Sequence, residues 1–467
     1  MVYFRKSVTR SNKCSRRYHR LKGAVTPAAA LILLLIFSML TGLIEAARIQ
    51  TAVTETEINA FAAQRSVAGY YHNQLWEDYD ILAIDMSKDR DELMRSYMVS
   101  AAESAGNIYS ADYESVELLP YYLTENGGDE LVRQATSCMK YRIPADMINN
   151  LKGGDLQEDA DKKQVENENL EARDEIVLDE EDYEEPDENT EDPREATADL
   201  ASEDGFADYV TGDMDVSARE GVKQVPVHGT LPPLSVTDHI LYNEYILSHF
   251  QTATAPEAGD RAMHYEVEYI LYGSTNDEAN LRAAIRRIRA IRLAMNTAYI
   301  MKHGTYEHAA FLAALVLSGW TLSPATVKAT KYALIAAWAY AESALDIKAL
   351  LKGKKVPLMK DASSWQLTYA NIASFRFMKE KDNGKGLTYE DYLRSFLSLQ
   401  KNAEKTDRVF DLIGSNLERK GKNGYLAEMA YGFDTSVRYN IDRRLFHSLW
   451  IPEELYRREF IAGYAYK

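Results

Sequence analysis

The chain of 467 residues is poor in cysteine, with only Cys14 and Cys138. Two thiols cannot build the disulfide framework that stabilises small secreted domains. The sequence also lacks a P-loop, a G-x-S-x-G nucleophile motif, an H-E-x-x-H zinc motif and a C-x-x-C pair. Its nine histidines are scattered, and His303 and His308 fall on different helix faces. We therefore expect no cofactor, no metal site, no catalytic residues and no enzyme activity.

Basic residues are in the minority, because 54 lysines and arginines stand against 71 acidic residues and the net charge is −17. A protein that binds nucleic acid is normally basic, so we expect no nucleic-acid partner. The charge is also uneven along the chain. Residues 1–23 carry eight basic side chains and no acidic one, residues 155–215 carry 26 acidic and four basic ones, and the rest has a net charge of −3. The acidity therefore belongs to one segment.

Residues 24–44 form a run of 21 residues without a charged side chain. As a helix, this run is roughly 32 Å long, which matches the hydrocarbon core of a bilayer. Because lysine and arginine are enriched on the cytoplasmic side, we expect residues 1–23 inside the cell and everything after Glu45 outside. The alternative is a cleaved signal peptide, but residues 44–46 make a poor cleavage site. We predict an uncleaved single-pass anchor in the cell membrane, with the lipid bilayer as a partner.

The helix is expected to continue beyond the membrane to about Gln64, because residues 45–50 contain no glycine or proline. Apolar side chains then recur at roughly helical spacing, at Ile49, Val53, Ile58, Phe61 and Ala62. We predict that this stripe packs against the protein's own extracytoplasmic part. Packing against neighbouring copies of the chain is the alternative.

Two N-terminal stretches resemble the start of TadE/TadG-type pseudopilins, namely residues 22–26 (KGAVT) and residues 45–49 (EAARI). The rest of the chain resembles a Gram-positive family of single-span proteins of unknown function, some of which are found beside Tad-type pilus genes. The matching segments are residues 71–82, 265–273, 337–342 and 387–393. The resemblance implies a surface or secretion-associated membrane protein whose partners are pilus or secretion-system proteins, or further copies of itself.

The resemblance also implies a candidate processing site between Gly23 and Ala24, where prepilins are cut. Prepilins typically carry glutamate five residues after the cleavage point, and this chain has Ala28 there. That departure weighs against incorporation into a filament, although it leaves a membrane-associated role in place.

We predict an α+β fold, in which a single N-terminal transmembrane helix precedes a mostly helical extracytoplasmic domain with a small β-sheet and an acidic disordered insert. The predicted parts are a basic cytoplasmic tail (1–23), a transmembrane helix (24–44), a membrane-proximal helix and α/β region (45–151), the insert (152–222) and a distal helix-rich α+β region (223–467) that packs with 45–151. Alternating side chains predict strands at 115–119, 265–272, 436–441 and 460–466, and the last two are expected to pair with the strand at 265–272.

The insert is expected to be a solvated spacer, because a block of like charges repels itself and buries too little apolar surface to fold. Weak calcium capture is one alternative, although the specific EF-hand loop is missing. Repulsion that keeps the domain off an anionic surface is another.

Apolar residues surround a distal segment at 309–322, which is too short to span a membrane. We therefore expect a buried helix that forms a hairpin with a second helix at 325–351. The preceding helix carries Arg282, Arg286 and Arg289 along one stripe. We expect a solvated or ion-paired face there, and the alternative is docking of an acidic ligand or of the chain's own insert.

Glu342 and Asp346 lie one turn apart on the same side of the second hairpin helix. Paired carboxylates could form a glycosidase site or a metal site. On an alanine-rich helix a structural role is the better interpretation, with Arg289 and Arg292 as candidate partners in buried core ion pairs.

Aromatic residues crowd residues 70–79 (YYHNQLWEDY). A core or helix-docking stripe explains them best, and a binding platform for carbohydrate or peptide is the alternative. For the whole chain we weigh three functions. The first is a structural or assembly role in a Tad-type pilus or secretion-related surface system. The second is an anchored ligand- or partner-binding module, and the third is an extracellular hydrolase that uses Glu342.

Overall fold

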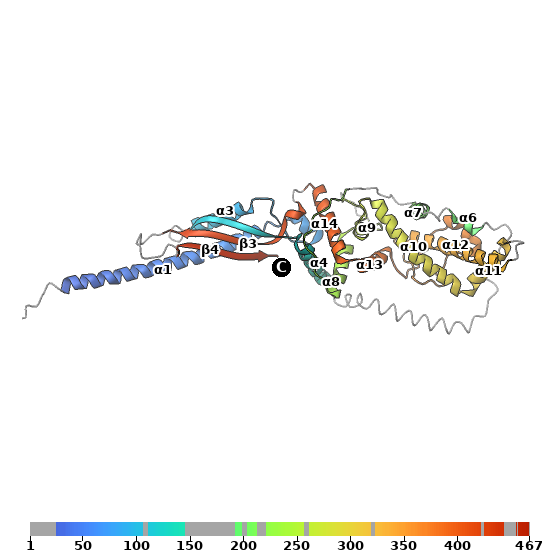
Figure 1. Ribbon diagram of the computed structural model, residues 1–467, viewed down its shortest axis with the longest axis horizontal. Helices are drawn as coiled ribbons and strands as arrows, with labels where there is room; N and C mark the ends of the chain where they lie inside the picture. The colour runs from blue at the N-terminus through green and yellow to red at the C-terminus, as the bar shows by residue number, and fades with distance from the viewer. Residues whose placement is uncertain are drawn as a thin grey trace, which may run out of the picture. The chain divides into compact units, whose positions relative to one another are not determined.

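The computed structural model describes residues 25–105, 111–144, 192–198, 203–212, 221–255, 261–318, 323–421, 425–442, 454 and 456–466. The chain divides into two compact units, and each is described by itself. Unit 1 comprises Met1–Val67, Arg90–Leu119 and Asp434–Ala462, and unit 2 comprises Ala68–Asp89, Pro120–Phe433 and Gly463–Lys467. The predicted α+β class is confirmed, because the described elements are mostly helices and the strands form one small sheet (Figure 1).

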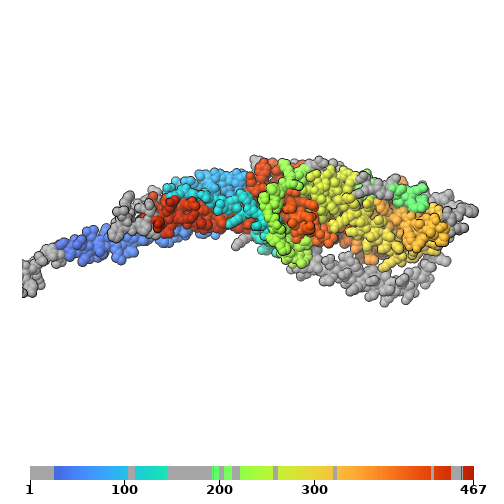
Figure 2. Space-filling view, viewed as in Figure 1, coloured from blue at the N-terminus to red at the C-terminus, as the bar shows by residue number. Residues whose placement is uncertain are grey.

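The first helix, α1 (Val25–Ala68), is continuous over 44 residues. Among the described residues it is the one helix long and apolar enough to cross a membrane. Its N-terminal half exposes large apolar side chains on every side, from Leu31 to Ile44, and extends beyond the strands of unit 1 (Figures 1 and 2). The candidate processing site at Gly23 and Ala24 lies outside the described residues.

The C-terminal half of α1 packs against the strands of unit 1, but only part of the predicted stripe takes part, because Ile49 is buried and Val53 partly buried. The buried positions are mostly small or polar, namely Ala52, Thr56, Ala60, Ala63, Gln64 and Val67. Gln64 Nε2 donates to Thr435 Oγ1 at 3.1 Å and to the Ala462 carbonyl at 3.0 Å. Ile58 and Phe61 were expected inside and are about half exposed, although the Phe61 ring packs edge-on against Phe460 of β4 with 5.0 Å between centroids. Small side chains let the helix approach the sheet closely, so its alanine face is buried and its larger apolar face is not.

Strand β3 is the centre of the sheet, and the other three strands all pair with it. The strands are β1 (Ile84–Asp85), β2 (Ala111–Tyr122), β3 (Met429–Ile441) and β4 (Arg457–Ala465). β1 is antiparallel to β3, with Ile84 opposite Ala430. In unit 1, α3 (Arg90–Ala105) lies along β2, where Asp91 accepts the Leu118 N–H at 2.9 Å. The sequence predicted β2, β3 and β4 near their observed positions.

Unit 2 is built mainly from helices whose apolar faces meet in one core that includes Trp338, Phe375 and Phe410. The helices are α2 (Asn73–Tyr79), α4 (Asp129–Arg142), α6 (Pro193–Ala196), α7 (Glu203–Thr211), α8 (Val236–His249), α9 (Glu266–Tyr272), α10 (Asp277–Lys302), α11 (Gly304–Leu317), α12 (Pro324–Leu351), α13 (Tyr389–Leu399) and α14 (Asn402–Arg419). The described part of the unit also contains the 3-10 segments η1 (Glu125–Gly128), η5 (Tyr369–Phe377) and η6 (Leu426–Glu428).

The strand predicted at 265–272 is wrong, because these residues form helix α9. Every side chain from Glu266 to Leu271 is buried, so α9 has no exposed face that would reveal a helical period. The chance alternation of its residues resembled a strand. The predicted pairing of the last two strands with this segment is therefore also wrong, and β4 pairs with β3 instead.

Part of the segment predicted to be a disordered insert is folded, because α6 and α7 lie within 152–222. Phe206 and Val210 of α7 are buried, and the Phe206 ring packs edge-on against Tyr340 with 5.2 Å between centroids. Phe206, Tyr209 and Val210 have helical spacing, but this short apolar signal is surrounded by acidic residues. Residues 145–191, which include most of the acidic region and the residues just before it, lie outside the described residues.

The predicted hairpin of α11 and α12 is present, but α11 is not buried on all sides. Ala310, Ala313 and Ala314 face the core, whereas Phe311 and Leu315 are exposed. The reason is the same as for α1, since alanines allow close helix packing and leave the larger side chains on the outer face.

Candidate functional site

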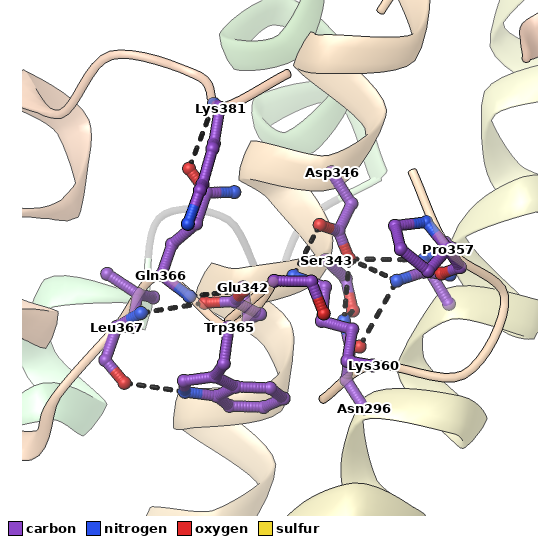
Figure 3. Close-up of polar contacts among 12 residues, drawn as sticks. Asn296, Glu342, Ser343, Asp346, Pro357, Lys360, Trp365, Gln366, Leu367 and Lys381 are labelled. Carbon is purple, nitrogen blue, oxygen red and sulfur yellow. Dashed lines mark hydrogen bonds and ion pairs between the residues drawn. The ribbon is translucent and has the colours of Figure 1, made fainter. Parts of the chain in front are cut away.

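Four charged side chains meet in the interior of unit 2 (Figure 3). They are Glu342 and Asp346 of α12, Arg292 of α10 and Lys360 of the loop after α12, and all four are fully buried. The Lys360 ammonium contacts both carboxylates and lies 2.6 Å from Asp346 Oδ1. Glu342 also accepts two backbone N–H groups of the loop at 3.0 Å, one to each oxygen. Two acids and two bases make the cluster neutral, which a buried site requires.

The second oxygen of Asp346 receives donors from α10. Arg292 donates from Nη2 at 2.7 Å and from Nε at 3.1 Å, and Asn296 donates from Nδ2 at 2.9 Å. Burial alone would raise the pKa of Asp346, but the charges of Arg292 and Lys360 outweigh it and lower that pKa. Burial raises the pKa of Glu342, and Lys360 offsets this only in part. The four groups form one electrostatic unit.

Of the four predicted ion-pair residues, Arg289 lies apart from this cluster. Its guanidinium lies 4.9 Å from the Phe206 ring centroid and donates to the Tyr340 hydroxyl at 3.0 Å. On the same stripe, Arg282 pairs with Asp208 at 2.8 Å. The contacts with Phe206 and Asp208 join α10 to α7. The arginine stripe therefore faces a folded part of the chain's own acidic segment.

The geometry argues against hydrolysis at Glu342. Its side chain has no exposed surface, and both oxygens are engaged by Lys360 and by backbone N–H groups. A glycosidase needs carboxyl groups that reach its substrate. The network instead ties the loop to α12 and α10, which is a structural arrangement. Sequence reasoning missed Lys360, because nothing in its loop sequence indicates that its ammonium is buried.

A further buried acid, Glu268 of α9, is held by neutral donors. Its Oε1 accepts the Ala253 N–H at 3.0 Å and the Tyr389 hydroxyl at 2.8 Å. Its Oε2 has no hydrogen-bond partner among the described residues. Burial raises the pKa of Glu268 to about 7, although these two donors counteract part of the shift. Glu268 therefore makes the stability of unit 2 depend on pH near neutrality.

Replacing Glu268 with glutamine is expected to flatten the pH profile of stability between about pH 5 and about pH 8. The carboxyl binds its proton more tightly in the folded state, with a pKa of about 7 against 4.5. The parent protein therefore loses stability as the pH rises from 4.5 through 7, by up to about 3 kcal/mol. Denaturant unfolding at a series of pH values measures the slope. Equal slopes in the parent and E268Q would contradict this role of Glu268.

Unit 2 also has an open cavity of about 310 Å³ beside α2 and α4. Its walls combine aromatic, charged and hydroxyl side chains, among them Trp76, Asp80, Arg133, Ser137, Tyr141 and Arg142. The aromatic segment at 70–79 is thus divided. Leu75 and Tyr79 belong to the core, Trp76 faces the cavity, and Tyr70 and Tyr71 are exposed outside the cavity lining.

Cys138 lies in the wall of the same cavity and donates to Asp80 Oδ2 at 3.5 Å. Burial raises the pKa of the Cys138 thiol, and the Asp80 charge raises it further. The thiol is therefore protonated near neutral pH and is a poor nucleophile. The side chains of this cavity suit reversible binding better than covalent catalysis.

Residues 183–441, more than half of the chain, match the model of a family described as "Family of unknown function (DUF5702)". The chain belongs to this family. No curated protein and no solved structure matches the chain. The DUF5702 segment contains the buried charge network, α7 and α9, whereas α1 and the cavity residues named above lie outside it.

Membership of DUF5702 supplies no activity, because the family's function is unknown. The match begins far beyond residues 22–49, which carry the resemblance to TadE/TadG-type pseudopilins. That resemblance therefore stays a prediction, and the function has to be argued from the geometry of α1 and of the cavity.

Proposed function

We propose that this DUF5702 protein is anchored in the cell membrane by α1, with its tail in the cytoplasm and its body outside. Its role is structural, as an assembly component of a Tad-type pilus or secretion-related surface system. Two features support the orientation: the exposed apolar half of α1 and the eight basic residues that precede it. In this proposal residues 1–23 stay on the chain, so protein purified from membranes is expected to retain its N-terminal tail, and a mature N-terminus at Ala24 would instead indicate the prepilin-like processing that the resemblance implies.

The observation that carries the assembly role is an apolar seam along the exposed side of α1. Its members alternate three and four residues apart, namely Ile44, Ala47, Thr51, Thr54, Ile58 and Phe61, and Phe61 at its end also packs edge-on against Phe460 of β4. Thr51 and Thr54 donate their hydroxyls back to carbonyl groups of α1, which makes the seam less polar. This spacing is the one by which helices pack side by side. The seam suits the same helix of a second copy or a helix of another subunit.

A photo-crosslinking amino acid at Ile58 is expected to give covalent protein adducts in intact cells. Ile58 is 56% exposed and lies in the seam, so a packed neighbour would touch it. The same probe at Glu57, about 100° around the helix, is the matched control and is expected to react several-fold less. Gel mobility and mass spectrometry identify the adducts. A copy of this chain or a pilus or secretion protein supports assembly; no protein adduct, or equal adducts at both positions, contradicts it.

The cavity beside α2 and α4 favours a second candidate function, an anchored ligand-binding module. It presents hydrogen-bonding groups and aromatic surface together, which is the usual composition of a small-molecule site. A membrane-anchored protein could carry both the seam and this cavity, because they lie in different parts of the chain.

A further inference from the structure

We infer that the cavity lined by Trp76, Asp80, Arg133 and Tyr141 binds a neutral saccharide. This inference deepens the second candidate function and does not depend on the assembly role of α1. The lining residues all belong to unit 2, so the site is complete within one compact unit.

Aromatic side chains supply the apolar part of the site. Trp76 is 40% exposed and Tyr141 is 92% exposed, although both are large enough to favour burial. An aromatic ring that stays exposed beside a cavity offers a flat, apolar surface with little conformational entropy to lose on binding. The face of a pyranose ring carries C–H groups and is also flat and apolar. Stacking of a sugar on these rings would explain why they are not covered by the core.

Hydrogen-bonding groups of both kinds supply the polar part. Asp80 Oδ2 is occupied by Arg142 at 2.6 Å and by His249 at 3.0 Å, whereas Asp80 Oδ1 has no partner among the described residues. Arg133 uses Nε and Nη2 for Glu130, and its Nη1 is unpartnered within the described part of the chain. An acceptor and a donor are therefore both available. Neighbouring hydroxyl groups of a sugar both donate and accept, so they match such a set.

The balance of charge excludes a strongly anionic ligand. Arg133 is paired with Glu130, and Arg142 is paired with Asp80, so each cation of the wall has its own carboxylate. A phosphate or nucleotide site would present cations in excess. A neutral ligand with many hydroxyl groups fits this balanced wall better than a phosphate or an acidic peptide.

The size of the cavity limits the ligand to a short segment. At about 310 Å³ it lies near the lower end of the range for small-molecule sites, roughly 300–1,000 Å³. Its openness to solvent means that a longer chain could continue outside. We therefore expect recognition of one or two sugar rings, either free or within a polysaccharide.

The test uses the full chain, purified in detergent, with four neutral probes: chitotetraose, cellotetraose, maltotetraose and isomaltotetraose. Saturation-transfer NMR reports which sugar protons contact the protein, and a titration gives the affinity. We expect at least one probe to bind, and W76A and Y141A each to weaken it about tenfold. The control Y332A removes another exposed tyrosine, on α12 and outside the cavity, and is expected to bind like the parent.

Thermal unfolding separates a binding defect from a folding defect. Tyr141 is almost fully exposed, so Y141A is expected to unfold at the parent temperature. Three outcomes overturn the inference: no binding of any of the four probes at millimolar concentration, equal binding by the parent, W76A and Y141A, or binding of inorganic phosphate in place of the sugars. None of these outcomes alters the crosslinking result at Ile58, so failure of this site and failure of the assembly role are distinguishable.

Discussion

Replacing Lys360 with methionine is expected to destabilise the protein by about 3–5 kcal/mol, the usual cost of removing one partner of a buried ion pair. Lys360 contacts both Glu342 and Asp346, and all three side chains are fully buried. Arg292 would still form an ion pair with Asp346, but Glu342 would keep only its two backbone N–H donors. Denaturant unfolding of the full chain in detergent measures the change in the free energy of unfolding.

The matched control is Lys381→Met, which removes an exposed lysine whose ammonium donates to the Ser363 carbonyl (Figure 3). It is expected to change stability by less than about 0.5 kcal/mol. Adding Glu342→Gln to Lys360→Met should recover part of the lost stability, because the buried charge without a cation is then gone. If K360M were as stable as K381M, the network would not be a structural connection between the loop and helices α10 and α12.

Replacing Phe206 with alanine is expected to cost about 3–5 kcal/mol, as for other fully buried phenylalanines. Phe206 is buried against Tyr340 and the Arg289 guanidinium, so its removal would leave a cavity between α7, α10 and α12. The residue lies in the acidic stretch that composition alone assigns to a disordered spacer. Urea unfolding of F206A compared with the parent gives the cost.

Tyr141→Ala is the control for that experiment, since it deletes an aromatic ring that is exposed to solvent. A loss below about 1 kcal/mol for F206A would mean that α7 is not part of the core and that the spacer interpretation extends over it. A loss near the expected value would place the boundary of the acidic insert before α7.

The sequence predicted those features that depend on composition over many residues. The apolar run at 24–44 indicated the helix that α1 forms, and alternating residues indicated β2, β3 and β4. Prediction failed where close packing decides the outcome. Alanines of α1 and α11 are buried while Phe61 and Phe311 are exposed, because a helix face of small side chains can approach its neighbour more closely.

The candidate sites show the same limit. Helical spacing placed Glu342 and Asp346 on one face of α12. Arg292 could be named as a partner because it lies on a second long helix, α10. Lys360 belongs to a loop, and no periodicity reveals which loop residue will be buried. The cavity brings Trp76 of α2 together with Arg133 and Tyr141 of α4, which are distant in sequence and share no motif.

The central claim is that α1 holds this DUF5702 protein in the membrane with its body outside the cell. It is tested most directly by labelling intact cells with a membrane-impermeant maleimide, in a Cys138→Ser background that keeps Cys14 in the basic tail. A second variant carries Cys14→Ser, Cys138→Ser and Ser374→Cys, which places one thiol at an exposed position of unit 2. The account predicts that the thiol at 374 reacts in intact cells and that Cys14 reacts only after lysis. Labelling of Cys14 in intact cells, or protection of position 374 until lysis, would contradict it.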